Sequence, residues 1–189
     1  MNDFSFPYGE SNRWRPPEEV PNLPPSPLRD WLLSEDSLTR KLKACCDHFE
    51  VRILGEKLLQ PADGEYAGCV SSILLWTREV LLCLDGVAWV FARTLIPNTL
   101  MTNLNTGLHS LGSRPLGELL YSNKAFVSGN IEISCFDSQH KLAKLATALS
   151  QPTDHALWGR RRYFTYQSQT LVVGEIFLPA AERAIKDMA

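Results

Sequence analysis

Hydrophobic residues recur at three- and four-residue steps in three parts of the chain, and this spacing predicts short helices. The three parts are residues 28–42, 103–121 and 141–149. In the first part, polar residues 34–37 separate two predicted helices. Ser37 or Asp36 can cap the second of these helices by accepting a backbone hydrogen bond.

Other apolar runs alternate with polar residues or are continuously apolar, and these predict strands. The six predicted strands cover residues 49–60, 74–83, 87–97, 126–135, 162–166 and 170–178. Asp85-Gly86 lies between two of them and predicts a hairpin turn, because glycine tolerates a positive φ. Strands joined as hairpins, with helices inserted between them, indicate an α+β fold with a single antiparallel β-sheet.

The first 27 residues differ in composition from the rest of the chain. They contain seven of its 12 prolines, which disrupt both helices and sheet ladders. We therefore expect a disordered proline-rich tail over residues 1–27 and one folded domain over residues 28–189.

Charge and composition narrow the class of protein. A net charge of −2 over 189 residues argues against a nucleic-acid partner, which requires a broad positive field. No apolar run approaches the roughly 18 to 20 residues that span a bilayer, and the N-terminus lacks a signal-peptide pattern. The five cysteines are an odd number without a C-x-x-C pair. We expect a cytoplasmic monomer with reduced thiols and no membrane span.

Several catalytic motifs fail. The glycine spacing of residues 107–114 resembles a phosphate-binding loop. That motif ends in Lys followed by Ser or Thr, whereas this chain has Ser113 followed by Arg114. The four histidines are scattered without metal-ligand spacing, so we expect neither a metal nor another cofactor. The run Arg160–Arg162 favours a solvated entry to a strand, with local contact to an anion as the alternative.

The predicted hairpin brings two arginines together. A two- or four-residue loop at Asp85-Gly86 places Arg78 directly opposite Arg93, on one face with apolar neighbours. Opposed like charges are destabilising, and a bound carboxylate would relieve the conflict. The alternatives are that both heads reach solvent at the sheet edge or pair with nearby glutamates, and a three-residue loop would shift the register by one.

Glu175 is a second candidate, because the predicted strand around it is apolar on both faces. A buried carboxylate costs several kcal/mol unless it is paired or protonated, and such groups are functional candidates. A structural ion pair with a buried arginine is the alternative.

Six blocks of the sequence resemble the chorismate pyruvate-lyase family, and they occur in the family's order. They are WLLSEDSLTRKL (31–42), LWTREVLLCLDGVAWVFARTLIP (75–97), LGSRPLGELLY (111–121), IEIS (131–134), LWGRRR (157–162) and GEIFLPA (174–180). The resemblance covers about residues 28–180. It implies helical flaps that close over a buried aromatic product, and the first step of ubiquinone biosynthesis, in which chorismate becomes 4-hydroxybenzoate and pyruvate.

The resemblance also implies site residues. The family's product-binding arginine falls on Arg78, its pocket leucine on Leu116 and its acidic residue on Glu175. Its flap methionine falls on Leu38, a substitution that keeps an apolar group of similar volume. Arg93 is assigned to the second carboxylate of chorismate. Residues 136–155 look like an insertion relative to shorter members.

These assignments give each residue a role in the elimination. Arg78 would bind the ring carboxylate and Arg93 the enolpyruvyl carboxylate. Glu175 would accept a hydrogen bond from the ring hydroxyl or act as a base. Leu38 and Leu116 would exclude water.

Two other functions fit the same residues. A non-catalytic module of this fold could bind a small aromatic acid, like the effector domains of some transcription regulators. A lyase could also act at another position of chorismate and release a different hydroxybenzoate isomer.

Overall fold

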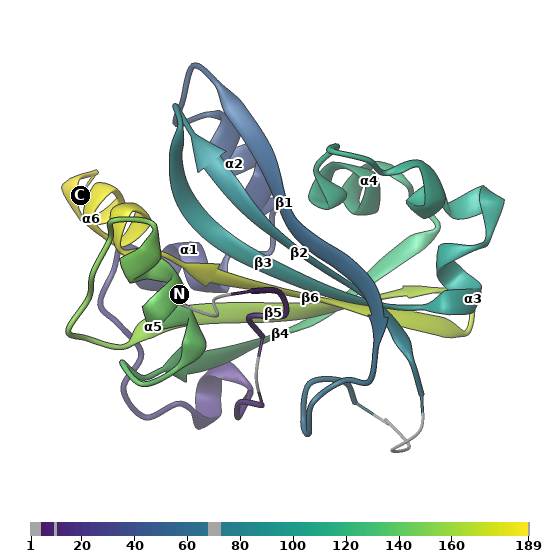
Figure 1. The fold of residues 1–189 in the computed structure, drawn as a ribbon, viewed down its shortest axis with the longest axis horizontal. Coiled ribbons are helices and arrows are strands. Elements are labelled where there is room, and N and C mark those ends of the chain that lie inside the picture. Colours follow the sequence, from purple (N-terminus) through teal and green to yellow (C-terminus); the bar gives the residue numbers. More distant parts are fainter. Residues whose placement is uncertain (1–4, 10, 68–72, 189) are drawn as a thin grey trace.

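The computed structural model describes residues 5–9, 11–67 and 73–188. Six antiparallel strands form one sheet in the order β1-β2-β3-β6-β5-β4, as Figure 1 shows. The strands are β1 (Phe49–Leu59), β2 (Leu75–Leu84), β3 (Val87–Pro97), β4 (Phe126–Phe136), β5 (Leu157–Tyr166) and β6 (Gln169–Phe177). The predicted α+β class and its six-stranded antiparallel sheet are confirmed.

Short helices precede, connect or follow these strands. The α-helices are α1 (Leu28–Leu33), α2 (Leu38–Lys43), α3 (Asn98–Met101), α4 (Leu116–Ser122), α5 (Lys141–Ala148) and α6 (Pro179–Asp187). Three single 3-10 turns are η1 (Pro17–Glu19), η2 (Leu104–Thr106) and η3 (Leu108–Ser110). None of the helices in the described ranges is long and apolar enough to cross a membrane.

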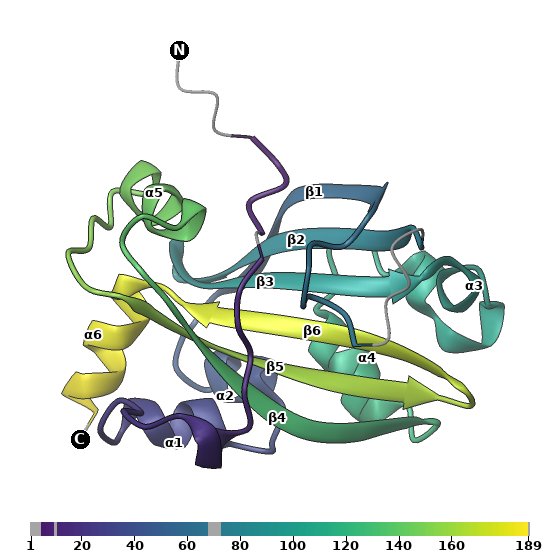
Figure 2. The ribbon, with the colours of Figure 1, turned by 90° about the horizontal axis from the view of Figure 1, so that it is seen from below.

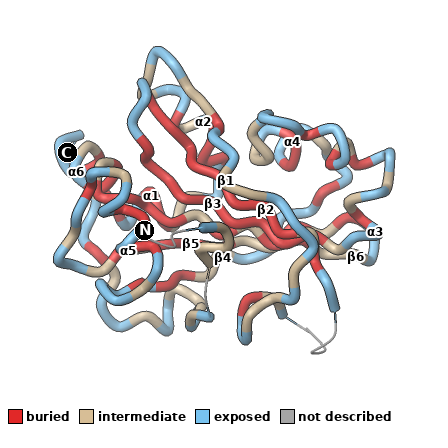
Figure 3. Tube along the Cα trace, in the orientation of Figure 1, coloured by how far each residue is buried: buried red, intermediate tan, exposed pale blue. Residues whose placement is uncertain are grey.

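Each face of the sheet has a different cover. Helices α2 and α4 lie over one face, which we call the flap face, whereas the chain over residues 5–9 and 11–20 crosses the other (Figures 1 and 2). We call that stretch the N-terminal segment and the surface beneath it the N-terminal face. Figure 3 shows buried residues along the central strands, between these two covers.

The β2–β3 hairpin begins as predicted and then changes register. Asp85 and Gly86 form a two-residue turn with φ of 49° and 85°, and Leu84 pairs with Val87. A bulge follows, because Cys83 pairs with Ala88 whereas Leu82 pairs with Val90, which leaves Trp89 as the extra residue. Beyond the bulge, each residue of β2 pairs with the β3 residue one position later than predicted.

This shift corrects the predicted opposition of Arg78 and Arg93. Arg78 lies opposite Thr94, and Arg93 lies opposite Glu79. Because neighbouring residues of a strand point to opposite faces, the two arginines lie on different sides of the sheet. The loop length was predicted correctly, and the bulge is the reason that the register was not.

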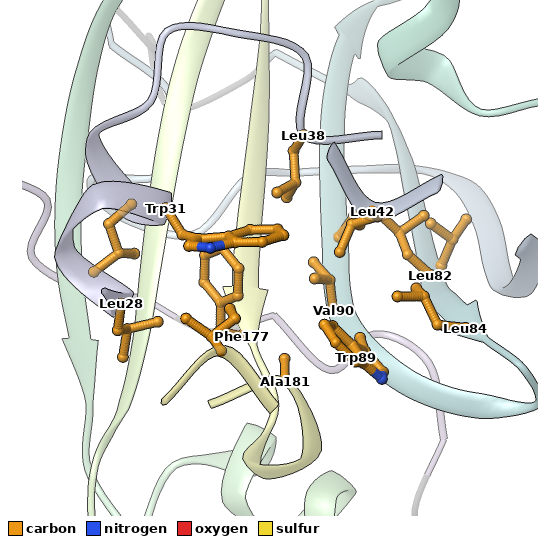
Figure 4. Close-up of a cluster of buried hydrophobic side chains, with 14 of the residues drawn as sticks. Leu28, Trp31, Leu38, Leu42, Leu82, Leu84, Trp89, Val90, Phe177 and Ala181 are labelled. Atoms are coloured by element: carbon orange, nitrogen blue, oxygen red, sulfur yellow. The ribbon is translucent and has the colours of Figure 1, made fainter. Parts of the chain in front are cut away.

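The apolar core of the flap face holds α1, α2 and α6 against the strands. Trp31 packs edge-on against Phe177 at 6.4 Å between ring centroids, with Leu38 above them and Ala181 below (Figure 4). Helix α6 was not predicted from the sequence. Pro179 at its first position and the buried side chain of Ile185 explain why it forms and where it packs.

The N-terminal segment makes specific contacts with the sheet, where the sequence predicted disorder. The backbone N–H groups of Tyr8 and Gly9 donate to the two carboxylate oxygens of Glu79 at 2.8 Å each. Arg15 exchanges two backbone hydrogen bonds with Ile133 of β4, at 3.0 and 2.8 Å. A fully buried carboxylate requires donors, and the segment supplies two of them. The predicted domain boundary at residue 27 stays a prediction.

The described cysteines Cys45, Cys46, Cys83 and Cys135 are free thiols, and Cys69 lies outside the described residues. Only Cys83 of these four is buried. A prediction that the cysteines are mostly core residues is therefore wrong for Cys45, Cys46 and Cys135.

Removing residues 1–9 should lower the melting temperature by about 4–8 °C. The deletion takes two backbone donors from buried Glu79, a loss of about 2 kcal/mol, and each kcal/mol corresponds to roughly 2–4 °C in a chain of this size. Differential scanning calorimetry measures the change. A variant lacking only residues 1–4 keeps both amides and serves as the control. Equal melting temperatures for all three proteins would show that the segment contributes nothing to stability.

Candidate active site

Two adjoining hollows lie on the flap face beneath α2 and α4. They share Gly117, Val173 and Glu175 in their walls. We call the pair the flap cavity. Its first part is also lined by Thr39, Arg78, Val80, Ala92, Thr94, Arg114 and Leu116, and its second part by Leu38, Leu120, Tyr121, Arg160, Arg162 and Phe164.

Strand register places Arg78 and Glu175 on the same face. Arg78 pairs with Thr94, and Thr94 pairs with Val173 one strand further. Glu175 pairs with Ala92 in the next row of side chains. Strand β3 therefore separates the two charged residues, at about 4.8 Å per strand spacing. Ala92 and Thr94 of β3, which line the cavity between Arg78 and Glu175, have small side chains.

Arg78 is buried at one end of the flap cavity, with 5% of its surface exposed. Its guanidinium forms an ion pair with Glu56 of β1, and its Nη2 donates to the carbonyl oxygen of Gly112 at 2.7 Å. The second bond ties Arg78 to the loop that leads into α4. A movement of the Arg78 guanidinium would therefore act directly on the loop that precedes the α4 flap.

Glu175 lies at the other end and is paired with Arg160. The Nε of Arg160 donates to Glu175 Oε2 at 2.8 Å, while its Nη1 donates to the carbonyl oxygens of Ser34 at 2.6 Å and Trp31 at 3.3 Å. Those two carbonyls belong to the end of α1 and the connection to α2. Arg160 thus joins the carboxylate in the cavity to the base of the other flap.

Arg160–Arg162 were predicted to be a solvated strand entry, and this interpretation is wrong. Arg160 and Arg161 are buried, and both lie within β5. Their side chains alternate between faces, so Arg160 meets Glu175 on the flap face and Arg161 meets Glu132 on the other, at 2.5 Å. A strand with buried charges is stable here because each charge has a partner.

Arg93 lies on the N-terminal face, away from the flap cavity. Its Nε and Nη2 donate to the two oxygens of Glu65 at 2.6 and 2.9 Å, and its Nη1 donates to Glu79 at 2.6 Å. Burial disfavours the charged guanidinium, but the hydrogen bonds and charges of the two glutamates outweigh burial and raise the pKa of Arg93 above its ordinary value. The structure therefore brings Arg78, Glu175, Leu38 and Leu116 together and leaves Arg93 out.

Arg160 was not predicted as a site residue, although the sequence contains a signal for it. A two-residue turn at Gln167-Ser168 pairs Tyr166 with Gln169, and counting back along both strands brings Arg160 opposite Glu175. Thr39, Arg114 and Gly117 had no such signal, because they line the cavity from separate loops and helices.

The two flaps touch one another over the cavity. Lys43 of α2 forms an ion pair with Glu118 of α4, and the Tyr121 hydroxyl of α4 donates to the carbonyl oxygen of Glu35 at 3.1 Å. A Cβ atom at Gly117 would lie 2.6 Å from Thr39 Oγ1. Glycine at this position allows the close approach of α4 to α2.

The protein is thus an α+β domain whose helical flaps close over a cavity that holds Arg78 and the ion-paired Glu175. The family model for chorismate lyase matches residues 10–184. This chain belongs to the chorismate lyase family.

Curated relatives extend over nearly the whole chain. A probable chorismate pyruvate-lyase of Shewanella sp. (strain W3-18-1) is 54% identical over 185 residues, which cover 98% of each chain. One of Aromatoleum aromaticum is 36% identical over 177 residues, covering 92% of this chain and 94% of the relative.

Solved structures share the fold at low identity. The effector domain of PhnF from Mycobacterium smegmatis has a TM-score of 0.55 and 16% identity, over 78% of this chain and 91% of that chain. The C-terminal domain of a histidine utilization repressor from Pseudomonas syringae has a TM-score of 0.53 and 8% identity, over 71% and 94%. These likenesses concern the fold alone.

Gly117→Ala should loosen the flaps without unfolding the protein. The new methyl group forces α2 and α4 apart, while alanine is about 1 kcal/mol better than glycine within a helix. We expect faster amide hydrogen exchange in both flaps and little change in melting temperature. The double variant Gly117→Ala/Thr39→Ala removes the opposing hydroxyl and should restore slow exchange. Exchange in Gly117→Ala as slow as in the wild type would show that the contact does not hold the flaps.

Proposed function

We propose that this protein eliminates pyruvate from chorismate in the flap cavity and releases 4-hydroxybenzoate, the first step of ubiquinone biosynthesis. The arrangement of Arg78 and Glu175 carries the proposal. A cation and a hydrogen-bond acceptor lie on either side of strand β3 in one cavity, as the carboxylate and the hydroxyl lie at opposite ends of the product. We also propose that the enzyme acts as a cytoplasmic monomer without a cofactor.

Arg78 binds the ring carboxylate in this proposal. Guanidinium matches carboxylate with two parallel hydrogen bonds, and the substrate would compete for the donor that now contacts Glu56. Because Glu56 is less buried than Arg78, its carboxylate can return to water when a ligand arrives. Leu116 and Leu38 cover the ring from α4 and α2 and keep water out.

Glu175 accepts a hydrogen bond from the ring hydroxyl. Its Oε2 is held by Arg160, which leaves Oε1 to face the ligand. That ion pair fixes the direction of the carboxylate, which suits an acceptor that orients the ring. Arg160 is therefore a positioning residue.

The elimination itself needs little from the protein. The ring carbon that bears the hydroxyl loses its proton, and that electron pair enters the ring as the bond from the neighbouring carbon to the enolpyruvyl oxygen breaks. Enolpyruvate then takes up a proton and becomes pyruvate. Because aromatisation supplies much of the driving force, orientation and charge stabilisation can account for the catalysis.

Incubating the purified protein with chorismate tests the proposed reaction. We expect pyruvate and 4-hydroxybenzoate in equal amounts, measured by a coupled pyruvate assay and by chromatography, also after dialysis against a chelator. Binding of 4-hydroxybenzoate without release of pyruvate would favour an effector module. Release of 3-hydroxybenzoate would favour a lyase of different regiochemistry. Either result would contradict the proposal.

Glu175→Gln should lower kcat by about tenfold. The amide keeps a carbonyl acceptor for the hydroxyl and for Arg160, whereas loss of a general base typically costs about 10²- to 10⁴-fold. Steady-state kinetics with Glu175→Gln and Glu175→Ala measure the difference. Glu132→Gln is the matched control, because Glu132 pairs with Arg161 on the opposite face. This variant can lose stability, but kcat per folded protein should stay unchanged. A Gln variant as slow as the Ala variant would instead identify Glu175 as the base.

A further inference from the structure

Four arginines line the flap cavity, and three of them have their guanidinium groups occupied. Arg78 pairs with Glu56, and Arg160 pairs with Glu175. Arg162 donates to the carbonyl oxygens of Gly129 at 2.6 Å and Glu35 at 2.7 Å, and to the Tyr121 hydroxyl at 3.1 Å. The fourth is Arg114, whose side chain has no hydrogen bond or ion pair with any residue that the structure describes.

The backbone at Arg114 is held in place although its side chain is exposed and unpaired. The Arg114 N–H donates to the carbonyl oxygen of Leu111 at 2.9 Å, and Pro115 follows directly as the residue before α4. Gly112, two residues earlier, accepts a hydrogen bond from Arg78. The free guanidinium is therefore carried by the same short loop that contacts the ring-carboxylate end of the cavity.

Chorismate is a dianion, so binding it requires a second cation besides Arg78. Chorismate has a carboxylate on the ring and another on the enolpyruvyl ether, whereas 4-hydroxybenzoate keeps only the first. Glu175 neutralises Arg160, and Arg78 is assigned to the ring carboxylate. Arg162 keeps its charge, but its guanidinium is held by two carbonyl oxygens and a hydroxyl. Arg93 cannot serve, because it lies on the other face with two glutamates of its own.

We propose that Arg114 binds the enolpyruvyl carboxylate of chorismate and so distinguishes substrate from product. This inference rests on the proposed function, with Arg78 on the ring carboxylate. Bound chorismate then contacts the α4 flap through Arg114. The departing enolpyruvate remains paired with Arg114 as its carbon–oxygen bond breaks. Once pyruvate has left, 4-hydroxybenzoate makes no contact with Arg114, and one of the interactions that closes the α4 flap is lost.

Arg114→Gln tests this assignment by separating substrate from product. We expect the KM for chorismate to rise about tenfold, as for the loss of one charge-assisted contact, while the Kd of 4-hydroxybenzoate stays within twofold of the wild-type value. Arg78→Ala should weaken both. Lys124→Gln, which removes an equal charge beyond the end of α4 and outside the cavity lining, is the control for long-range attraction and should change neither constant.

Three results would overturn the assignment of Arg114. They are an unchanged KM in Arg114→Gln, an equal loss of product affinity in that variant, or a selective rise in KM in Arg162→Gln instead. Failure of the proposed function looks different, because the wild-type protein would then release no pyruvate, or Arg78→Ala would leave both constants intact.

Discussion

The register of the β2–β3 hairpin decides which charged residues share a face. A shift of one residue in a strand exchanges its two faces, and the bulge at Trp89 makes that shift between the turn and the functional part of the hairpin. Arg78 consequently lies beneath the flaps, and Arg93 lies beneath the N-terminal segment. The placement of Arg78 and Arg93 on different faces follows from this single extra residue.

Ion-paired rows of charged residues cross both faces of the sheet, and each face also has a hollow that borders its row. On the N-terminal face, Glu79, Arg93, Arg161 and Glu132 form two ion-paired groups, which Tyr8, Gly9 and Trp14 cover. Removing one partner of such a buried pair leaves an uncompensated charge and is strongly destabilising. On the flap face, Arg78 and Glu175 are also paired, yet a cavity separates them. Under the proposed function, the buried charges on the N-terminal face serve stability and those on the flap face bind the ligand.

The sequence was sufficient for the elements whose signals are local. The six strands, the Asp85-Gly86 turn and helix α5 follow from periodicity and turn chemistry. The bulge was not predictable, because nothing near Trp89 distinguishes an extra residue from a paired one. Helix α6 was missed since its apolar residues are few, and its stability comes from packing against α1 and β3.

The residues of the candidate site also differ in whether they have a local sequence signal. Glu175 was identified correctly as a residue that needs a partner, and its partner Arg160 is given by the short turn between β5 and β6. Arg114 and the contact of Gly117 with Thr39 depend on how the two flaps meet, which is a tertiary property without a local sequence signal.

The most direct test of this account is a crystal structure with 4-hydroxybenzoate bound. The account predicts the ligand on the flap face, with its carboxylate on Arg78, its hydroxyl on Glu175 and no contact with Arg93. A ligand bound between the N-terminal segment and the sheet, with its carboxylate on Arg93, would contradict it.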